Sequence, residues 1–276
     1  MSVSVFIFLV LIISNGVYQV LVLGDDIKYF YEVAMNATNP FVSDKLSSHS
    51  YHEMYGRFLI PHLRNIHSQI NRGYRFMEIG AGCAQPQKKK GMDIWSALFD
   101  HAKNDKIWVA EMKRKCIQKM DRLMSIPSGI KFLFGDQSNV NDLQRWVNDT
   151  GGAFDAIVDD GSHKNIHIFK SLMYLFEHAL APGGLYFIED IQVSRGKEYV
   201  DHVPFAGKNS RGDPAPLFIS EVLKDWTEQL LVPSSSANEH WVYPVIPNLK
   251  GIFCMSEACV LFKCSKQGKE PAHCTR

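Results

Sequence analysis

The sequence predicts an α/β protein with a Rossmann-like, doubly wound and mostly parallel sheet, closed by a C-terminal antiparallel hairpin. Three observations lead to this fold class. Five short apolar runs alternate with helical patterns between residues 74 and 188, the first run leads directly into Gly80-Ala81-Gly82, and acidic residues follow several of the runs. Such alternation is typical of a parallel sheet joined by crossover helices. With 276 residues, 46% of them hydrophobic, the chain is long enough for one well-filled domain of this kind.

The individual elements follow from apolar periodicity and from the breaks between periodic runs. Two helices are expected ahead of the sheet, separated by Asn39-Pro40. The complete set of expected helices is 29–35, 51–70, 93–102, 113–124, 140–148, 164–179 and 217–231. The expected strands are 74–79, 106–111, 131–134, 154–158 and 185–188, with 241–244 and 251–263 as the closing hairpin. The long polar loop 192–216 is expected to be functional, because loops of this length in compact domains usually are.

An uncharged, largely apolar segment runs from Val3 to Leu23. It suits either a cleaved signal peptide or a retained anchor, and the lack of a basic start leaves that choice open. We therefore expect a signal peptide or signal anchor in residues 1–24, a helical cap in 25–72 and the α/β domain in 73–276. The predicted location is the endoplasmic reticulum or Golgi lumen, single-pass anchored, or secreted, with membrane contact only through the N-terminal segment if uncleaved. N-x-T sequons at Asn36 and Asn148 agree with that location.

The charge balance and the cysteines set further limits. Lys and Arg total 30 against 29 Asp and Glu, so no field of one sign is available to attract nucleic acid, and we expect no nucleic-acid partner. Four cysteines crowd the last 23 residues and are expected to form one or two disulfides in an oxidising compartment. Cys83 and Cys116, far apart in the sequence, are expected to be solitary thiols.

Residues at the ends of the first three strands predict a site for an adenosine-containing cofactor. In a sheet of this kind, ligands bind at the carboxyl ends of the strands. Glu78, Gly80 and Gly82 end the first strand, Glu111 ends the second, where an acid is expected to accept ribose hydroxyls, and Asp136-Gln137 follows the third, where a carboxylate could bond an adenine amino group. The third glycine of a dinucleotide fingerprint is missing, which counts against NAD. Each acid taken singly could instead cap a helix or a turn.

Four carboxylates end the next two strands: Asp159 and Asp160 after one, and Glu189 and Asp190 after the other. Carboxylates this close repel one another and require a cation or protonation. Oxygen ligands of this type favour Mg²⁺, which would bind a substrate hydroxyl and lower its pKa. His163 lies three residues after Asp160 and is the expected general base. The alternatives are that Asp159 or Asp160 only caps a helix and that His163 is structural.

The same residues make the chain resemble a known family. The runs FDAIVDDGSH (154–163), LAPGGLYFIED (180–190), MEIGAG (77–82), GDQS (135–138) and SYHEMY (50–55) resemble the class I methyltransferases, above all the macrolide-sugar O-methyltransferases and their eukaryotic relatives. The resemblance covers roughly residues 45–264. It departs from the family pattern after the glycine loop, where Cys83-Ala84-Gln85-Pro86 and a lysine-rich insertion follow.

The resemblance implies S-adenosylmethionine and Mg²⁺ as cofactors. The residues assigned to S-adenosylmethionine are Glu78, Gly80, Gly82, Glu111, Asp136, Gln137 and Asp159. Those assigned to Mg²⁺ are Asp160, Glu189 and Asp190, and those assigned to catalysis are His163 and Asp160.

The predicted function is that of an S-adenosylmethionine-dependent, metal-assisted O-methyltransferase acting on a sugar or glycan hydroxyl in the secretory pathway. Methyl transfer is a direct displacement, so alignment of the acceptor and its deprotonation carry most of the catalysis. Loop 192–216 is expected to close over the acceptor, with Arg195, Lys197 and Tyr199 as contacts. Two alternatives stay open: a phenolic or polyketide-type small-molecule O-methyltransferase, and a non-catalytic secreted binding module on the same fold.

Overall fold

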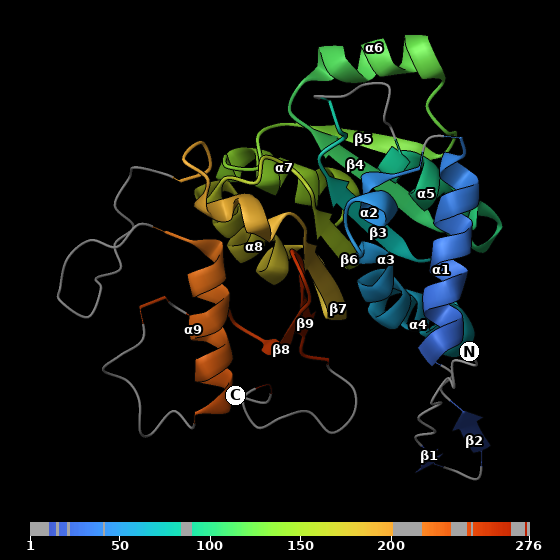
Figure 1. The fold of residues 1–276 in the computed structure, drawn as a ribbon, viewed down its shortest axis with the longest axis vertical. Coiled ribbons are helices and arrows are strands. Elements are labelled where there is room, and N and C mark those ends of the chain that lie inside the picture. Colours follow the sequence, from blue (N-terminus) through green and yellow to red (C-terminus); the bar gives the residue numbers. More distant parts are fainter. Residues whose placement is uncertain are drawn as a thin grey trace, which may run out of the picture.

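The computed structural model describes residues 11–14, 17–20, 23–40, 42–83, 90–200, 217–232, 242–243, 245–265 and 274. It confirms the predicted fold class. A seven-stranded sheet has the order β5-β4-β3-β6-β7-β9-β8 (Figure 1). Its strands are β3 (Arg75–Ile79), β4 (Lys106–Glu111), β5 (Ile130–Phe134), β6 (Phe154–Asp159), β7 (Leu180–Ile188), β8 (Leu249–Cys254) and β9 (Cys259–Lys263). Neighbouring strands from β5 through β7 pair in parallel, whereas β9 pairs antiparallel with both β7 and β8.

The strand order reverses between β3 and β6. The chain builds outward from β3 to β4 and β5, then returns to place β6 on the other side of β3. In open α/β sheets, the crevice at the carboxyl ends of the two strands beside such a reversal is where ligands bind. The topology therefore directs the search for a site to the ends of β3 and β6.

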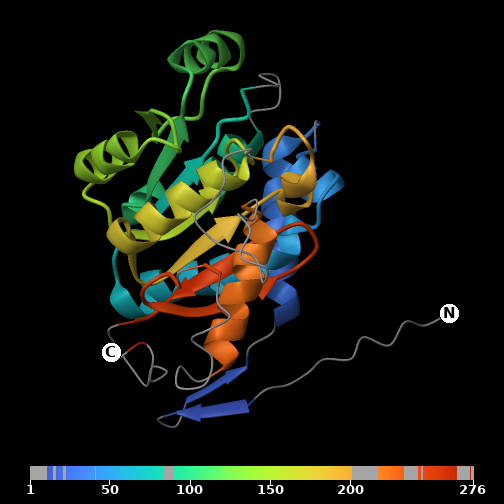
Figure 2. The ribbon, with the colours of Figure 1, turned by 90° about the vertical axis from the view of Figure 1, so that its left-hand side faces the viewer.

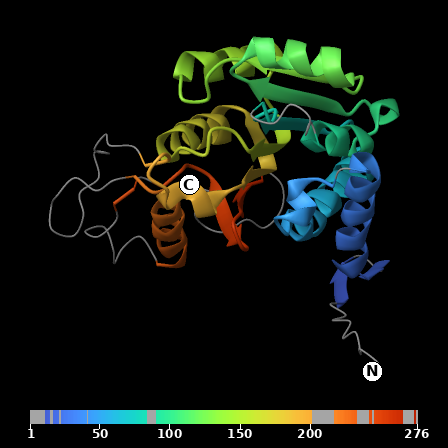
Figure 3. The ribbon, with the colours of Figure 1, turned by 45° about the horizontal axis from the view of Figure 1, so that its top comes forward.

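Helices cover both faces of the sheet because alternate strand residues point to opposite sides. On one face, Met77 and Ile79 belong to a core with α7 (Val140–Thr150), α8 (Asn165–His178) and α9 (Ile219–Leu231). On the other, Phe76 packs with α1 (Leu23–Thr38), α5 (Lys90–Leu98) and the N-terminal helices. Figures 2 and 3 show these two layers, with the N-terminal helices on the side of the sheet away from α8 and α9. Helix α6 (Arg114–Met124) packs on a small third cluster with Ala81 and Val109.

The predicted helix 51–70 is present as one helical run with two π-helical stretches. It comprises α3 (Tyr51–Met54), η1 (Tyr55–Leu59), α4 (Ile60–Asn65) and η2 (Ile66–Ile70), and ends at Asn71 in the left-handed conformation. A short helix, α2 (Asp44–Ser47), precedes it. π-Helical turns are frequent at functional sites, and Tyr55, at the start of the first one, is fully buried.

Three element boundaries differ from the predictions. The expected helix 93–102 is α5 followed by a separate 3₁₀ turn, η3 (His101–Lys103). Strand β7 begins at Leu180 and continues through the Pro-Gly-Gly segment that was expected to precede it. The expected single strand 251–263 is instead most of the hairpin β8–β9, turning at Glu257 with φ +69°. Residues 241 and 244 of the other expected hairpin strand lie outside the described residues.

The N-terminal segment is described at residues 11–14 and 17–20. These residues form β1 (Leu11–Ser14) and β2 (Val17–Val20), which pair antiparallel with each other. Within the described ranges, no helix has the length and apolar character needed to cross a membrane.

All six cysteines are paired in disulfides. Cys254–Cys259 joins β8 to β9, and Cys264–Cys274 lies beyond them, so the two C-terminal disulfides agree with the prediction. The expectation of solitary thiols at Cys83 and Cys116 is wrong, because these two residues form a disulfide with each other. The glycine loop after β3 and helix α6 after β4 are brought together by the parallel pairing of their strands, a contact that their separation of 33 residues conceals.

Candidate active site

A cavity of about 520 Å³ opens at the carboxyl ends of β3, β4, β5 and β6, at the reversal of strand order. Most of the predicted site residues line it. We call Gly80, Gly82, Glu111, Asp136 and Gln137 the β3–β5 half of the cavity, and Asp160, His163 and Asp190 the β6–β7 half. The predicted residues Glu78, Asp159 and Glu189 are not among its lining residues.

The glycine loop after β3 fits tightly against the loop after β6. Gly80 has φ +100°, and a Cβ atom there would lie 2.0 Å from the carbonyl oxygen of Asp160. Only glycine meets both demands. The backbone can therefore form the cavity wall itself and let a ligand approach closely.

Glu111 holds two loops of the cavity together. Its Oε2 accepts a hydrogen bond from Ala81 N–H at 3.3 Å, and its Oε1 accepts one from Lys113 N–H at 2.8 Å. A carboxylate oxygen can accept more than one hydrogen bond. Glu111 thus has the capacity to bind ligand hydroxyls while it orients the glycine loop.

Asp136 and Gln137 follow β5 and have different roles. Asp136 Oδ1 accepts a hydrogen bond from Ser138 N–H at 2.8 Å, a turn typical of aspartate. Gln137 is buried, donates to both oxygens of Asp159 at 3.0 and 3.1 Å, and accepts from Ser162 N–H at 2.8 Å. Gln137 therefore ties the loop after β5 to the loop after β6.

In each pair of acids at the ends of β6 and β7, one acid is buried and the other lines the cavity. Asp159 is 1% exposed and also accepts a hydrogen bond from Ser171 at 2.7 Å, while burial raises its pKa. Only Asp160 of that pair lines the cavity, and only Asp190 of the Glu189–Asp190 pair does. Asp159, which was predicted to contact the cofactor, is thus buried and is not among the residues that line the cavity.

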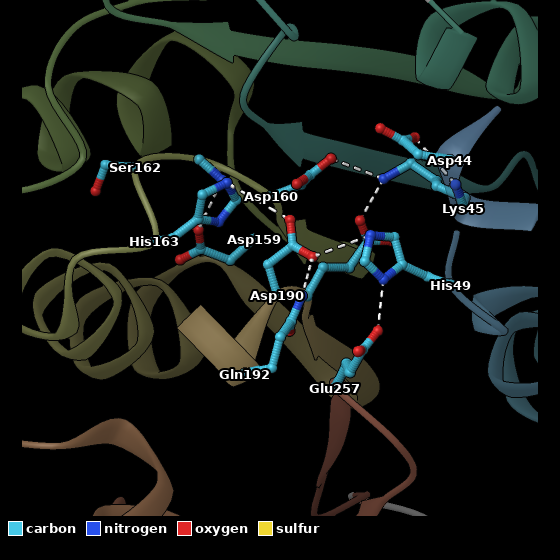
Figure 4. Close-up of polar contacts among 12 residues, drawn as sticks. Asp44, Lys45, His49, Asp159, Asp160, Ser162, His163, Asp190, Gln192 and Glu257 are labelled. Atoms are coloured by element: carbon cyan, nitrogen blue, oxygen red, sulfur yellow. Dashed lines mark hydrogen bonds and ion pairs between the residues drawn. The ribbon is translucent and has the colours of Figure 1, made fainter. Parts of the chain in front are cut away.

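Glu189 and Glu78 face a buried lysine that the sequence analysis missed. Lys45, from α2, is 3% exposed and forms ion pairs with Asp160 at 2.8 Å, with Glu189, and with Glu78 at 3.6 Å (Figure 4). Burial raises the pKa of Glu78 to about 7, against the opposing effect of Lys45. Burial alone would lower the pKa of Lys45, but the charges of Asp160 and Glu189 outweigh it and raise that pKa well above its usual value.

The three cavity-lining residues of the β6–β7 half form a candidate metal centre. Among the described residues, Asp160, His163 and Asp190 are the group whose ligand atoms all lie within 4.8 Å of one another. His163 Nε2 lies 3.6 Å from Asp190 Oδ2 (Figure 4). Both residues have positive φ, +57° at His163 and +56° at Asp190. This conformation is costly for residues other than glycine and clusters at functional sites.

Side chains from distant parts of the chain surround Asp190. Tyr51 donates to Asp190 Oδ1 at 2.8 Å, and Gln192 donates to the same oxygen at 3.0 Å. These bonds outweigh the effect of burial and hold the pKa of Asp190 below its usual value. His49 Nε2 lies 3.6 Å from Asp190 Oδ1, and its Nδ1 is 2.5 Å from Glu257 Oε2 in the β8–β9 turn (Figure 4).

Of the predicted acceptor contacts in loop 192–216, Arg195 contacts α9 and Tyr199 lies beside His163. Arg195 pairs with Glu221 and stacks on Phe218, so it points to α9 and not to the predicted acceptor. The ring of Tyr199 lies 6.2 Å from that of His163, edge to face. Residues 201–216 lie outside the described residues.

The donor set fits a divalent cation. Asp160 and Asp190 supply the carboxylate oxygens that Mg²⁺ prefers, and His163 adds a nitrogen at the same place. Glu189, the third predicted ligand, is instead bonded to Lys45 and to the hydroxyl of Tyr55. The sequence motif 50–55 contains Tyr51 and Tyr55, so their proximity to the site was signalled there, whereas nothing local signalled Lys45, His49 or Glu257.

Comparisons with known proteins find methyltransferases. No family model matches the chain. The chain is 31% identical over 158 residues to mycinamicin VI 2''-O-methyltransferase of Micromonospora griseorubida, which is 53% of this chain and 35% of the relative. It is 31% identical over 134 residues to demethylmacrocin O-methyltransferase of Streptomyces fradiae, 48% of this chain and 31% of the relative.

A third relative is the 8-demethyl-8-alpha-L-rhamnosyl tetracenomycin-C 2'-O-methyltransferase of Streptomyces olivaceus, 27% identical over 154 residues, 55% of this chain and 36% of the relative. The matched segment thus spans about a third of the length of these relatives. Among solved structures, MycE methyltransferase in complex with Mg and SAH has a TM-score of 0.60 and 23% identity, covering 88% of this chain and 56% of that chain. Its complex with Mg, SAH and mycinamycin VI has the same TM-score, covering 88% and 55%.

The comparisons correct the predicted location. The matched relatives come from Micromonospora and Streptomyces, bacteria that have neither an endoplasmic reticulum nor a Golgi apparatus. These relatives are biosynthetic O-methyltransferases by name, and no described helix could cross a membrane, so we withdraw the prediction of a secretory location, whether luminal, anchored or secreted. In its fold, and in sequence over about half of its length, the chain resembles the class I S-adenosylmethionine-dependent methyltransferases, with macrolide-sugar O-methyltransferases among its relatives.

Proposed function

We propose that the protein is an S-adenosylmethionine-dependent, metal-assisted O-methyltransferase that acts on a sugar hydroxyl of a small-molecule glycoside. One observation carries the proposal: a single cavity at the reversal of strand order is lined both by Glu111 and Asp136 and by Asp160, His163 and Asp190. The first pair suits a nucleoside, and the second group suits a metal and a base. A methyl donor and an acceptor hydroxyl would meet in this cavity.

The β3–β5 half is proposed to bind the adenosine part of S-adenosylmethionine. Glu111 faces the cavity with both oxygens already oriented by backbone N–H groups, so its remaining acceptor capacity suits the ribose hydroxyls. Asp136, oriented by Ser138, suits the adenine amino group. The close approach of Gly80 to Asp160 leaves the wall beside them without side chains.

The β6–β7 half is proposed to prepare the acceptor. When bound, S-adenosylmethionine supplies a methyl group that its sulfonium already activates, and a divalent ion lowers the pKa of a hydroxyl that binds it. Asp160 and Asp190 are proposed to hold the ion, and His163 is proposed as the base and not as a ligand of the ion. It takes the proton from the acceptor hydroxyl at Nε2, the nitrogen that faces Asp190. Asp190 then stabilises the imidazolium by its negative charge.

Alignment of the acceptor oxygen with the methyl group contributes most of the remaining rate. The rigid support of Asp190 by Tyr51 and of the loop after β6 by Gln137 serves that alignment. The three O-methyltransferase relatives act on macrolide or tetracenomycin compounds, one of them rhamnosylated by name, which supports a glycoside as the acceptor.

Titration calorimetry of S-adenosylmethionine into the full chain, with and without Mg²⁺, tests the cofactor. We expect micromolar binding, and a folded sample that binds no S-adenosylmethionine in either condition would overturn the proposal. Asp190→Asn serves as a control, because a change in the β6–β7 half should leave this binding intact.

An acceptor screen tests the substrate class. Matched glycosides and their aglycones are incubated with protein, S-adenosylmethionine and Mg²⁺, and mass spectrometry records the gain of a methyl group. Methylation of glycosides but not of aglycones is the expected result. Methylation of the aglycones alone, or of phenols without a sugar, would contradict the sugar assignment.

A further inference from the structure

The ammonium group of Lys45 pairs with Asp160 and Glu189, two carboxylates that were predicted to bind a metal ion. Its ammonium is 2.8 Å from Asp160 Oδ2, contacts Glu189, and is 3.6 Å from Glu78 Oε1. It is the counter-charge for three carboxylates that come from β3, β6 and β7. Figure 4 shows Lys45 approaching Asp160 from the side opposite to His163.

The surroundings fix Lys45 in this position. Its side chain is 4% exposed, and the face of Trp95 lies 5.9 Å from its Nζ atom. Its backbone N–H donates to the Oγ atom of the buried Ser43, which caps α2. A buried ammonium is stable only when it is paired with negative groups, and here the pairing is complete.

Asp160 is shared between two cation sites. It is a member of the candidate metal group with His163 and Asp190, and it is also paired with Lys45. A divalent ion on Asp160 and an ammonium 2.8 Å from one of its oxygens would repel each other strongly, because both lie in a partly dry environment. Binding of a divalent ion to Asp160 should therefore weaken the ion pair between Asp160 and Lys45.

We propose that Lys45 competes with the divalent ion: its ammonium and the metal are alternative counter-ions of Asp160, and metal binding displaces Lys45 from that carboxylate. The inference rests on the metal assigned under the proposed function. Lys45 is a positioning residue in this scheme, since it keeps the carboxylates in place before the metal arrives and sets how tightly the metal binds. A purely structural lysine would have the opposite effect when removed, because loss of the fold weakens metal binding.

Calorimetric titration of Mn²⁺, used as a probe for the metal, into the wild-type protein and into Lys45→Met tests this competition. The titration contains no S-adenosylmethionine and no acceptor, so it does not depend on turnover. We expect Lys45→Met to bind Mn²⁺ at least tenfold more tightly than the wild type. Its melting temperature should fall in the absence of Mn²⁺ and recover when Mn²⁺ is added.

Lys263→Met is the matched control. Lys263 is also buried, but it donates to the carbonyl groups of Phe176, Glu177 and Leu180, away from the cavity. This variant should lose stability without any change in Mn²⁺ affinity. Unchanged or weaker Mn²⁺ binding by Lys45→Met would overturn the inference, while binding of Mn²⁺ by the wild type would still leave the metal assignment standing.

A second measurement covers the case in which Lys45→Met does not fold. In wild-type protein labelled with ¹⁵N at the lysine side chains, the Lys45 ammonium signal, identified as the one absent from Lys45→Arg, should shift when Mg²⁺ is added. A signal that stays in place at saturating Mg²⁺ would contradict displacement. Absence of any divalent-ion binding by the wild type would overturn both this inference and the metal part of the proposed function.

Discussion

The two halves of the cavity are built in different ways. The β3–β5 half consists of residues that directly follow their strands, and its contacts are mostly to backbone groups nearby, as Glu111 to Lys113 and Asp136 to Ser138 show. The β6–β7 half depends on side chains from distant parts of the chain, with Lys45 from α2 at one side and Glu257 from the β8–β9 turn at the other. Under the proposed assignment, the half that binds the cofactor is therefore built mostly from local contacts, whereas the half that holds the metal and the acceptor requires tertiary assembly.

The strongest test of this division is His163→Ala. A general base contributes about 10² to 10⁴-fold to the rate, roughly 3 to 5 kcal/mol, so kcat should fall by that factor. S-Adenosylmethionine affinity, which belongs to the β3–β5 half, should stay unchanged in calorimetry. His167→Ala is the matched control, because His167 lines the same cavity but its Nδ1 is bonded to Ser162 at 2.9 Å. Equal loss of kcat in both variants would mean that His163 is not the base.

The two disulfides near the sheet offer the next comparison. Cys83 lines the cavity, and its bridge to Cys116 closes a segment of 33 residues. Replacing both by serine should cost about 2 to 4 kcal/mol in urea unfolding and weaken S-adenosylmethionine binding. The Cys254–Cys259 bridge closes only 5 residues, so its double serine variant should lose less stability and keep full cofactor affinity. Equal effects of the two pairs would show that the glycine loop does not need its bridge.

Glu111→Ala should affect one half and spare the other. Loss of hydrogen bonds to a charged group costs about 1.5 to 3 kcal/mol, so the Kd of S-adenosylmethionine should rise roughly 10- to 100-fold. The affinity for Mn²⁺ should not change. Glu257→Ala, the same kind of truncation beside the β6–β7 half, should leave S-adenosylmethionine binding at the wild-type value. A rise in the Kd of S-adenosylmethionine for this variant would mean that the two halves do not act independently.

Tyr51→Phe is expected to have the smallest effect. Its hydroxyl donates to Asp190 Oδ1 and accepts from the Asp190 N–H. The Asp190 side chain is 22% exposed, so water can replace the lost bonds, and the cost should be about 0.5 to 1.5 kcal/mol. Tyr55→Phe removes a hydroxyl from Glu189, which is 1% exposed, and should cost more because no water reaches that carboxylate. Thermal unfolding of both variants measures the difference, and a larger loss for Tyr51→Phe would contradict this reading of burial.

The sequence was sufficient for the architecture and for the β3–β5 half. Strand and helix periodicity is local, so the parallel sheet and its order of elements could be predicted, and residues at strand ends such as Gly80 and Glu111 follow from the strands themselves. The boundary errors arise where the break between two strands is short, as at residues 255–258 between β8 and β9, and where Leu180 already pairs with β6 ahead of the Pro-Gly-Gly segment.

The contacts of the β6–β7 half could not be predicted in full because they depend on packing. Four acids in two pairs suggested one metal cluster, but Asp159 and Glu189 are buried and do not line the cavity, whereas Asp160 and Asp190 do. Lys45 supplies part of the positive charge that these carboxylates require. It lies 115 residues before Asp160 in the chain. No spacing rule connects residues so far apart. The Cys83–Cys116 bridge was missed for the same reason.

The contact between His49 and Glu257 also bears on the order in which a growing chain acquires its parts. Every residue of the β3–β5 half leaves the ribosome before β6, whereas Glu257 follows after β8. Since chains emerge from the N-terminus and begin to fold as they do so, the residues proposed to bind the nucleoside are all synthesised before the residues of β6 that complete the cavity, and the support of Asp190 has all of its residues only near the end. Under the proposed assignment, the last contact to form around the site is therefore one that serves the acceptor and not the cofactor.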